Sequence, residues 1–186
     1  MQLLENSFIA RCAKGNRTAQ KQLFEHLYAP MFRVCMRYLN HKEDAEDCLM
    51  KGFLKVFQHL PRFSYENENG FLGWVRRIMA NECLMFLRQK NRFLLFPEEE
   101  PLQGQFPAEA LLKMEAEELN SLIMQLPLGY RTVFNLFAIE GFSHKEISAL
   151  LQISENTSKT QFSKAKARLK SMLEQKKPLV YGKLGE

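Results

Sequence analysis

Short polar and basic side chains gather over residues 154–164, and their types suit the recognition of DNA. The spacing predicts a helix that begins just after Ser154 and carries hydroxyl, amide and ammonium groups on its first turns. Such groups can hydrogen-bond base edges in a major groove, while lysines and the helix N-terminus bind phosphates. The candidate DNA-binding residues are Asn156, Thr157, Lys159, Thr160, Ser163 and Lys164.

A shorter helix must hold this basic helix in place. Residues 143–146 read Ser-His-Lys-Glu, a capping-box pattern that predicts a helix from His144. Gln152 then stands at the turn, where glycine is usual because the backbone there takes a positive φ. We predict a helix-turn-helix whose second helix turns Lys159, Thr160, Ser163 and Lys164 away from an inward stripe. An ordinary helical hairpin with a solvated basic face fits the same pattern.

A second candidate nucleic-acid surface lies upstream, at residues 71–92. This predicted helix has five basic residues against one acidic, and it contains the only tryptophan of the chain, Trp74. Aromatic side chains can stack on unpaired bases while Arg76 and Arg77 hold phosphates. The preceding segment, residues 62–70, is predicted to be a polar loop whose Tyr65, Asn67 and Asn69 could contact a ligand. The alternative is an amphipathic core helix in which the tryptophan is simply buried.

The segment 40–60 predicts the clearest helix of the N-terminal half. Asn40 is expected to cap it, and carboxylates follow in the first turns, where the helix dipole favours them. Met50 and Leu54 fall on the side that should face solvent. Exposed apolar groups beside carboxylates suggest a docking surface for another protein, with an unremarkable solvated face as the alternative.

Bulk composition sets further bounds. The chain has 186 residues, a net charge of +5 and ordinary hydrophobic content, so it can hold one large or two small domains. Residues 154–177 carry seven basic and two acidic side chains, whereas residues 97–118 carry one basic and seven acidic. Charge is therefore segregated, as expected when separate surfaces serve separate partners.

Several function classes find no support in the sequence. It contains no phosphate loop, nucleophile elbow, carboxylate pair or metal-ligand set, and the four histidines are dispersed, so we expect neither an enzyme nor a cofactor. The four cysteines have no CxxC or Cys/His spacing, and we expect reduced, buried thiols. No apolar run approaches ~18 residues, which predicts a soluble, cytoplasmic protein without a membrane partner.

The predicted fold is all-α, with two small helical domains joined by a linker. We expect the first domain at residues 1–94 and the second at residues 111–177, followed by a tail at 178–186. Residues 95–110 contain prolines, a glycine and consecutive glutamates, which predict an extended acidic linker.

This order of motifs resembles the extracytoplasmic-function (ECF) sigma factors, two-domain bacterial initiation factors for RNA polymerase. The resemblance covers roughly residues 6–173. The segments that carry it are Asp44-Ala45-Glu46-Asp47, residues 52–57, residues 71–81, Leu126-Pro127, residues 130–134 and residues 141–169.

The resemblance implies particular partners. The helix with Asp44, Asp47, Met50, Lys51 and Leu54 would bind the clamp helices of the polymerase β′ subunit. The second domain would read the −35 promoter element as duplex and touch the β flap. The acidic linker would follow the RNA exit path, and an anti-sigma factor is a further expected partner.

The resemblance also implies how the −10 promoter element is held. Trp74, Arg76, Arg77 and Asn81, together with the preceding loop, would capture the melted non-template strand. A flipped base would occupy a pocket formed by that loop and Asn81. The competing hypothesis is a stand-alone helix-turn-helix regulator, which should instead bind pseudo-palindromic DNA as a dimer.

Overall fold

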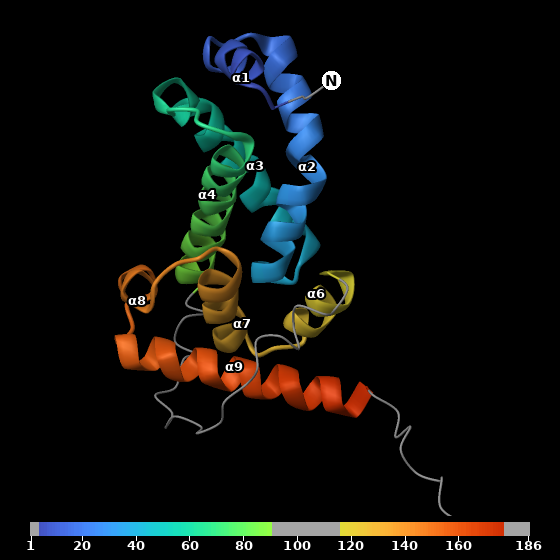
Figure 1. Ribbon diagram of the computed structural model, residues 1–186, viewed down its shortest axis with the longest axis vertical. Coiled ribbons are helices and arrows are strands. Elements are labelled where there is room, and N and C mark those ends of the chain that lie inside the picture. Colours follow the sequence, from blue (N-terminus) through green and yellow to red (C-terminus); the bar gives the residue numbers. More distant parts are fainter. Residues whose placement is uncertain (1–3, 91–115, 177–186) are drawn as a thin grey trace, which may run out of the picture. The chain divides into compact units, whose positions relative to one another are not determined.

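The computed structural model describes residues 4–90 and 116–176, which form helices joined by short connections and contain no strand (Figure 1). The prediction of an all-α fold is confirmed for these residues. The chain divides into two compact units, residues 1–94 and 95–186, and each is described here by itself. The predicted linker at 95–110 and tail at 178–186 lie outside the described residues.

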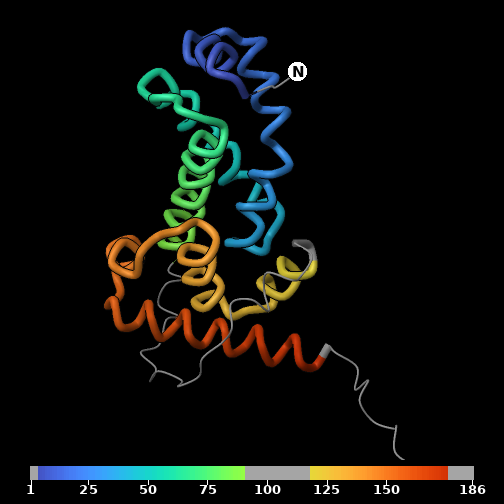
Figure 2. The backbone as a smooth tube through the Cα atoms, viewed as in Figure 1, coloured from blue at the N-terminus to red at the C-terminus, as the bar shows by residue number. Residues whose placement is uncertain are grey.

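The first unit is built on three long helices that pack against one another: α2 (Arg17–Leu39), α3 (Lys42–His59) and α4 (Glu68–Gln89). A short helix, α1 (Asn6–Ala13), packs on α2 at one end, next to the 3₁₀ turn η1 (Leu60–Arg62) (Figures 1 and 2). Each long helix places one apolar stripe in the shared core, so the three helices bury one another's apolar side chains.

Gly52 sets the close approach of α3 to α4. A Cβ atom at this position would lie 2.3 Å from Sδ of Met79, a side chain of α4 that is fully buried. Glycine therefore lets the two helix backbones come together over the methionine, despite its low helix propensity.

The predicted cap of α3 was wrong by one residue. Asn40 does not cap this helix; it ends α2 in the left-handed region at φ 52°, with its backbone N–H donating to the carbonyl of Met36. His41 occupies the capping position of α3, and its Nδ1 accepts from the Asp44 backbone N–H at 3.5 Å. Asparagine tolerates the left-handed conformation better than most residues, which favours it at the C-terminal cap that follows α2.

The polar loop before α4 is shorter than predicted. The helix begins at Glu68 instead of Phe71, because the Oδ1 of Asn67 accepts the backbone N–H of Gly70 at 2.8 Å. An asparagine side chain that bonds the N3 amide is a standard helix N-cap. Asn69 consequently lies in the first turn of the helix and not in the loop.

The second unit contains α6 (Ala116–Met124), α7 (Leu128–Phe134), one turn of π-helix named η3 (Asn135–Ile139), α8 (His144–Leu151) and α9 (Glu155–Lys176). The long α9 contacts α6, α7 and α8, so it is covered from several sides. One buried apolar cluster takes its side chains from α6, α7, α9 and the turn after α6: Leu122, Ile123, Leu126, Phe134, Ala165 and Leu169.

Arg131 ties α6 to α7. It is 6% exposed, and its Nη1 donates to the carbonyl of Met124 at 3.1 Å, at the C-terminal end of α6. Carbonyls at a helix C-terminus lack partners within the helix, so a guanidinium there satisfies one of them. Burial lowers the pKa of Arg131 from its ordinary value.

None of the helices described by the structure is both long enough and apolar enough to span a lipid bilayer. Among the same residues, no group of three or more His, Cys, Asp or Glu side chains is arranged to hold a metal ion.

Candidate nucleic-acid and protein interfaces

The end of the second unit has helix-turn-helix geometry. The Ser143 Oγ accepts the backbone N–H of Glu146 at 3.2 Å, and the Glu146 carboxylate accepts the Ser143 N–H at 2.8 Å, so the predicted capping box is present. Gln152 closes α8 at φ 56°, so the turn keeps its left-handed backbone although glutamine stands where glycine is usual. The Ser154 Oγ then caps α9 by accepting the Thr157 N–H at 2.9 Å. These three local signals were all readable in the sequence.

His144 connects the two helices of this motif. Its Nδ1 lies 2.9 Å from Oγ of Ser158 on α9, and its ring stacks on Phe137 with centroids 4.2 Å apart. Burial, together with the charge of Lys159, lowers the pKa of His144 from its ordinary value. The neutral imidazole is therefore favoured in the folded unit. The sequence showed only a dispersed histidine, because the residues it contacts are distant along the chain.

The outer face of α9 differs from the prediction. Asn156 and Lys159 are exposed, and Ser163 is half-buried, so these side chains can reach a ligand. Thr160, however, is only 2% exposed, and Thr157 is 9% exposed with its Oγ1 2.7 Å from the Ser154 Oγ. The prediction that Thr160 lies on the solvent face was wrong. Because α9 contacts three helices, its buried face is wider than one stripe.

Two lysines of α9 lie in different surroundings. Lys159 forms an ion pair with Glu155 one turn earlier, at 2.8 Å, and this hydrogen bond lowers the pKa of the Glu155 carboxyl. Lys164 is half-buried and lines a surface hollow of ≈310 Å³ together with Tyr130 and Arg168. The ammonium groups of both lysines can bind phosphates. Lys164 lies beside α7, whereas Lys159 is on the exposed face near the start of α9.

The exposed face of α3 carries the predicted apolar groups. Met50 is 50% exposed and Leu54 is 62% exposed, so both lie on the solvent side as predicted. The charged members of this face are paired within the unit. The Lys51 Nζ lies 2.6 Å from Asp47, and the half-buried Asp44 lies 3.8 Å from the Nζ of Lys90, the residue that follows α4.

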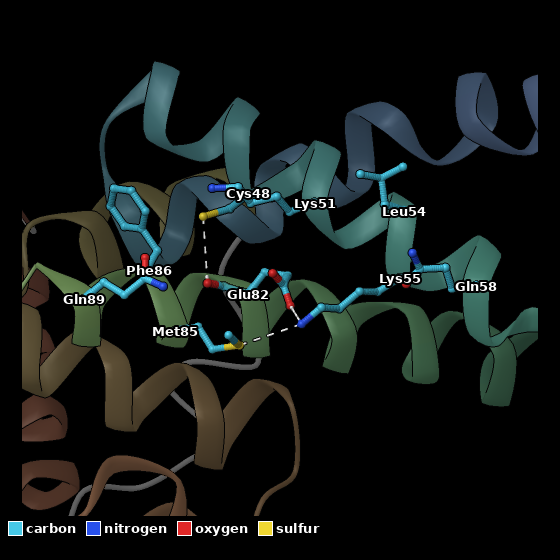
Figure 3. A pocket seen from close by; sticks show the side chains of 9 residues that line it. All are labelled: Cys48, Lys51, Leu54, Lys55, Gln58, Glu82, Met85, Phe86 and Gln89. Carbon is cyan, nitrogen blue, oxygen red and sulfur yellow. Dashed lines mark hydrogen bonds and ion pairs between the residues drawn. The ribbon is translucent and has the colours of Figure 1, made fainter.

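A pocket of ≈350 Å³ opens between α3 and α4 (Figure 3). Its lining includes Leu54 and Lys55 from α3, and Glu82 and Met85 from α4. Lys55 bridges the two helices, because its Nζ lies 2.5 Å from the Glu82 carboxylate and 3.8 Å from Sδ of Met85. Met85 is 45% exposed and extends the apolar surface of α3 onto α4. The sequence gives no sign that Met85 belongs to this surface, since a single apolar residue on a polar face produces no periodic pattern.

The aromatic and basic helix α4 presents the third candidate surface. Trp74 is half-buried and stacks against Phe63, with ring centroids 4.5 Å apart and an interplanar angle of 28°. Arg77 and Asn81 are exposed, and Arg76 is half-buried. Residues 74, 77 and 81 are spaced i, i+3 and i+7, so they share one face of the helix. Trp74 is therefore not fully buried, and it shares a helix face with the exposed Arg77 and Asn81.

Two of the predicted loop ligands have partners inside the unit. The Tyr65 hydroxyl donates to the carbonyl of Leu4, which lies before α1, and Asn67 caps α4. These side chains tie down the segment between η1 and α4. Asn69 is exposed in the first turn of α4 and stays available as a ligand residue.

Taken together, these features define a class of helical protein in which a helix-turn-helix unit accompanies a helical unit with an aromatic and basic face. Comparison with known protein families defines this class more narrowly. Residues 23–93 match the family model of Sigma-70 region 2, and residues 116–169 match that of Sigma-70 region 4.

Two curated relatives are similar over most of the chain. The RNA polymerase sigma factor SigZ of Bacillus subtilis is 27% identical over 154 residues, covering 83% of this chain and 86% of the relative. The ECF RNA polymerase sigma factor SigM of Mycobacterium tuberculosis is 27% identical over 167 residues, covering 89% and 82%. The solved structure of CnrH in complex with the cytosolic domain of CnrY is 24% identical, with a TM-score of 0.49 and coverage of 91% and 97%.

The chain belongs to the extracytoplasmic-function family of RNA polymerase sigma factors.

Proposed function

We propose that this protein directs bacterial core RNA polymerase to particular promoters and starts transcription there, without catalysing a reaction itself. The observation that carries the proposal is the presence of both sigma-70 regions in order, the second with intact helix-turn-helix geometry. Since core polymerase and the chromosome are in the cytoplasm, the protein would act there. The family gives no support to the alternative of a stand-alone dimeric regulator.

The exposed face of α3 is proposed to bind the β′ clamp helices. Met50 and Leu54 supply apolar area that is costly to leave in water, and they are the natural anchors of such a contact. Asp44, Asp47 and Lys51 would form its polar rim, where their existing ion pairs limit the gain from new ones.

The melted −10 strand is proposed to lie along the exposed face of α4. Trp74 is half-buried, so part of its surface is open to a base, while Arg76 and Arg77 would bind phosphates. Asn69 and Asn81 are exposed amides that can hydrogen-bond an unstacked base. Tyr65 and Asn67 would act differently, by holding the segment before α4 in place through their contacts with Leu4 and Gly70.

The −35 element is proposed to meet α9 in the major groove. Asn156, Lys159 and Ser163 lie on its accessible side, with Lys164 on the flank for a phosphate. Thr157 and Thr160 are buried, so we assign them to helix packing and leave them out of the base contacts. The β flap would contact the same unit.

Two further expectations follow from the family resemblance alone. The acidic linker, including Glu98 to Glu100, would follow the RNA exit path, although it lies outside the described residues. An anti-sigma factor would hold the protein inactive until a stimulus releases it.

Run-off transcription tests the proposal directly. The purified chain is added to sigma-free bacterial core polymerase on a library of upstream sequences from the source genome. We expect defined start sites only when the chain is present. Absence of both polymerase binding and initiation, with specific retardation of duplex DNA by a dimer of the chain alone, would establish the regulator instead.

A further inference from the structure

Two lysines bridge α3 and α4 at the pocket of ≈350 Å³ that opens between these helices (Figure 3). Lys55 of α3 reaches Glu82 of α4, with 2.5 Å between Nζ and Oε1. Lys90, which follows α4, lies 3.8 Å from Asp44 of α3, and its Nζ lies 4.9 Å from the ring centroid of Phe86, a residue of the pocket wall. These contacts hold the two walls in place, so the pocket exists without a partner.

Exposed apolar side chains line this pocket from both helices. Leu54 of α3 is 62% exposed, and Met85 of α4 is 45% exposed. Within the described part of the chain, the only other large apolar side chain with this much exposure is Met50. Apolar area left in water is unfavourable, so a partner that covers Leu54 and Met85 together gains from both. The pocket is therefore a candidate docking surface.

The pocket also contains a positioned cation. Glu82 is 6% exposed, whereas the Lys55 side chain is 40% exposed. An ammonium group has three N–H donors, and Lys55 directs one to Glu82 and another to Sδ of Met85, at 3.8 Å. The third donor can bond a carboxylate or carbonyl oxygen of a partner. The pocket thus fits an apolar side chain that has an acceptor group beside it.

Leu54 belongs both to this pocket and to the face of α3 that is proposed to bind polymerase. A helix with its side chains is about 10–12 Å wide, so one that covers Leu54 also lies against the pocket. We propose that the β′ clamp helices place an apolar side chain between Leu54 and Met85 and bond Lys55 through an oxygen acceptor. This inference rests on the proposed function and extends its polymerase contact from α3 onto α4. Glu82 is a positioning residue, because it acts through Lys55.

The test is titration of the labelled full-length chain with sigma-free core polymerase in the absence of DNA, followed by anisotropy. Met85→Ala should raise the Kd about 3- to 10-fold, in proportion to the exposed share of its side chain. Met85→Leu is the matched control, because it keeps the apolar volume, and it should bind like the unchanged chain. Combining Met85→Ala with Leu54→Ala should weaken binding by less than the product of the two single effects, since both residues contact one inserted side chain. A full product would overturn that shared contact.

The role of Glu82 is tested in two backgrounds. Glu82→Gln keeps the size of the side chain but removes the charge that holds Lys55. It should raise the Kd for polymerase in the unchanged chain and have no further effect in a chain that carries Lys55→Ala. A merely structural role for Glu82 would change the Kd in both backgrounds. Urea unfolding checks that these variants fold, and the Met85 variants test the surface without altering a buried charge.

The outcomes distinguish this inference from the proposed function. If Leu54→Ala weakens binding and Met85→Ala does not, polymerase covers α3 alone, and the inference is overturned while the proposed function stands. If the unchanged chain does not bind core polymerase, both fail. Self-association of the chain that Met85→Ala abolishes in sedimentation velocity would assign the pocket to a second copy of the chain, which also overturns the inference.

Discussion

Leu54→Ala should weaken binding to core polymerase while leaving the protein folded. Leu54 is 62% exposed, so most of its surface is free to be buried by a partner. Full burial of a leucine side chain is worth about 1.5–3 kcal/mol, and 62% of that is roughly 1–2 kcal/mol. Since about 1.4 kcal/mol corresponds to tenfold in affinity, the Kd should rise roughly 5- to 20-fold.

The same exposure predicts a small effect on stability. A substitution on the surface, away from caps and buried networks, usually changes the free energy of unfolding by less than about 0.5 kcal/mol. Urea unfolding of Leu54→Ala should therefore match the unchanged chain. Leu54→Met serves as the control for binding, because it keeps the apolar volume at the site.

The assay is titration of a fluorescently labelled chain with core polymerase in the absence of DNA, followed by anisotropy. Without DNA, the signal depends on the protein contact alone. If Leu54→Ala is folded and binds core polymerase with the same Kd as the unchanged chain and Leu54→Met, the assignment of the α3 face to polymerase fails.

Three further predictions concern the second unit. Lys159→Ala should weaken promoter binding about equally across −35 sequences and reduce the salt-dependence slope by about 1, as measured with polymerase at several salt concentrations; an unchanged slope would mean that Lys159 touches no phosphate. Ser143→Ala should lower the free energy of unfolding by about 0.5–2 kcal/mol, because Ser143 and Glu146 cap each other at the start of α8; urea midpoints equal to those of the unchanged chain would contradict this. Because burial and Lys159 lower the pKa of His144, the unfolded chain binds more protons near the ordinary value of about 6.5, so stability should fall as pH drops through it, and His144→Asn should flatten that part of the pH profile in thermal unfolding.

Local signals in the sequence were sufficient for much of the second unit. The capping box at Ser143, the turn at Gln152 and the cap at Ser154 each depend on residues within four positions of one another. Interactions of such short range are nearly independent of the rest of the fold, so the helix-turn-helix could be predicted. The exposed Met50 and Leu54 could be predicted for a related reason, because a 3.6-residue period separates the two faces of α3.

The sequence did not fix the helix boundary where either of two neighbouring residues could cap the next helix. Asn40 and His41 lie between α2 and α3, and the sequence favoured asparagine as the cap of the second helix. Asn40 takes the left-handed conformation that ends α2, so His41 becomes the N-cap residue of α3. At the start of α4 the sequence predicts Asn67 as a ligand-binding residue. In the structure its side chain instead accepts a hydrogen bond from the first turn of that helix.

Only the tertiary structure decided which side chains of the remaining elements face solvent and which meet across helices. Periodicity gives the direction of one buried stripe, but it does not show how many helices will pack on α9. Three helices contact α9, and Thr160 is buried. The sequence by itself determined an all-helical chain with a helix-turn-helix and an exposed apolar face on α3. The contact of His144 with Ser158 and the pocket beside Met85 depend on packing between distant segments, which no local pattern encodes.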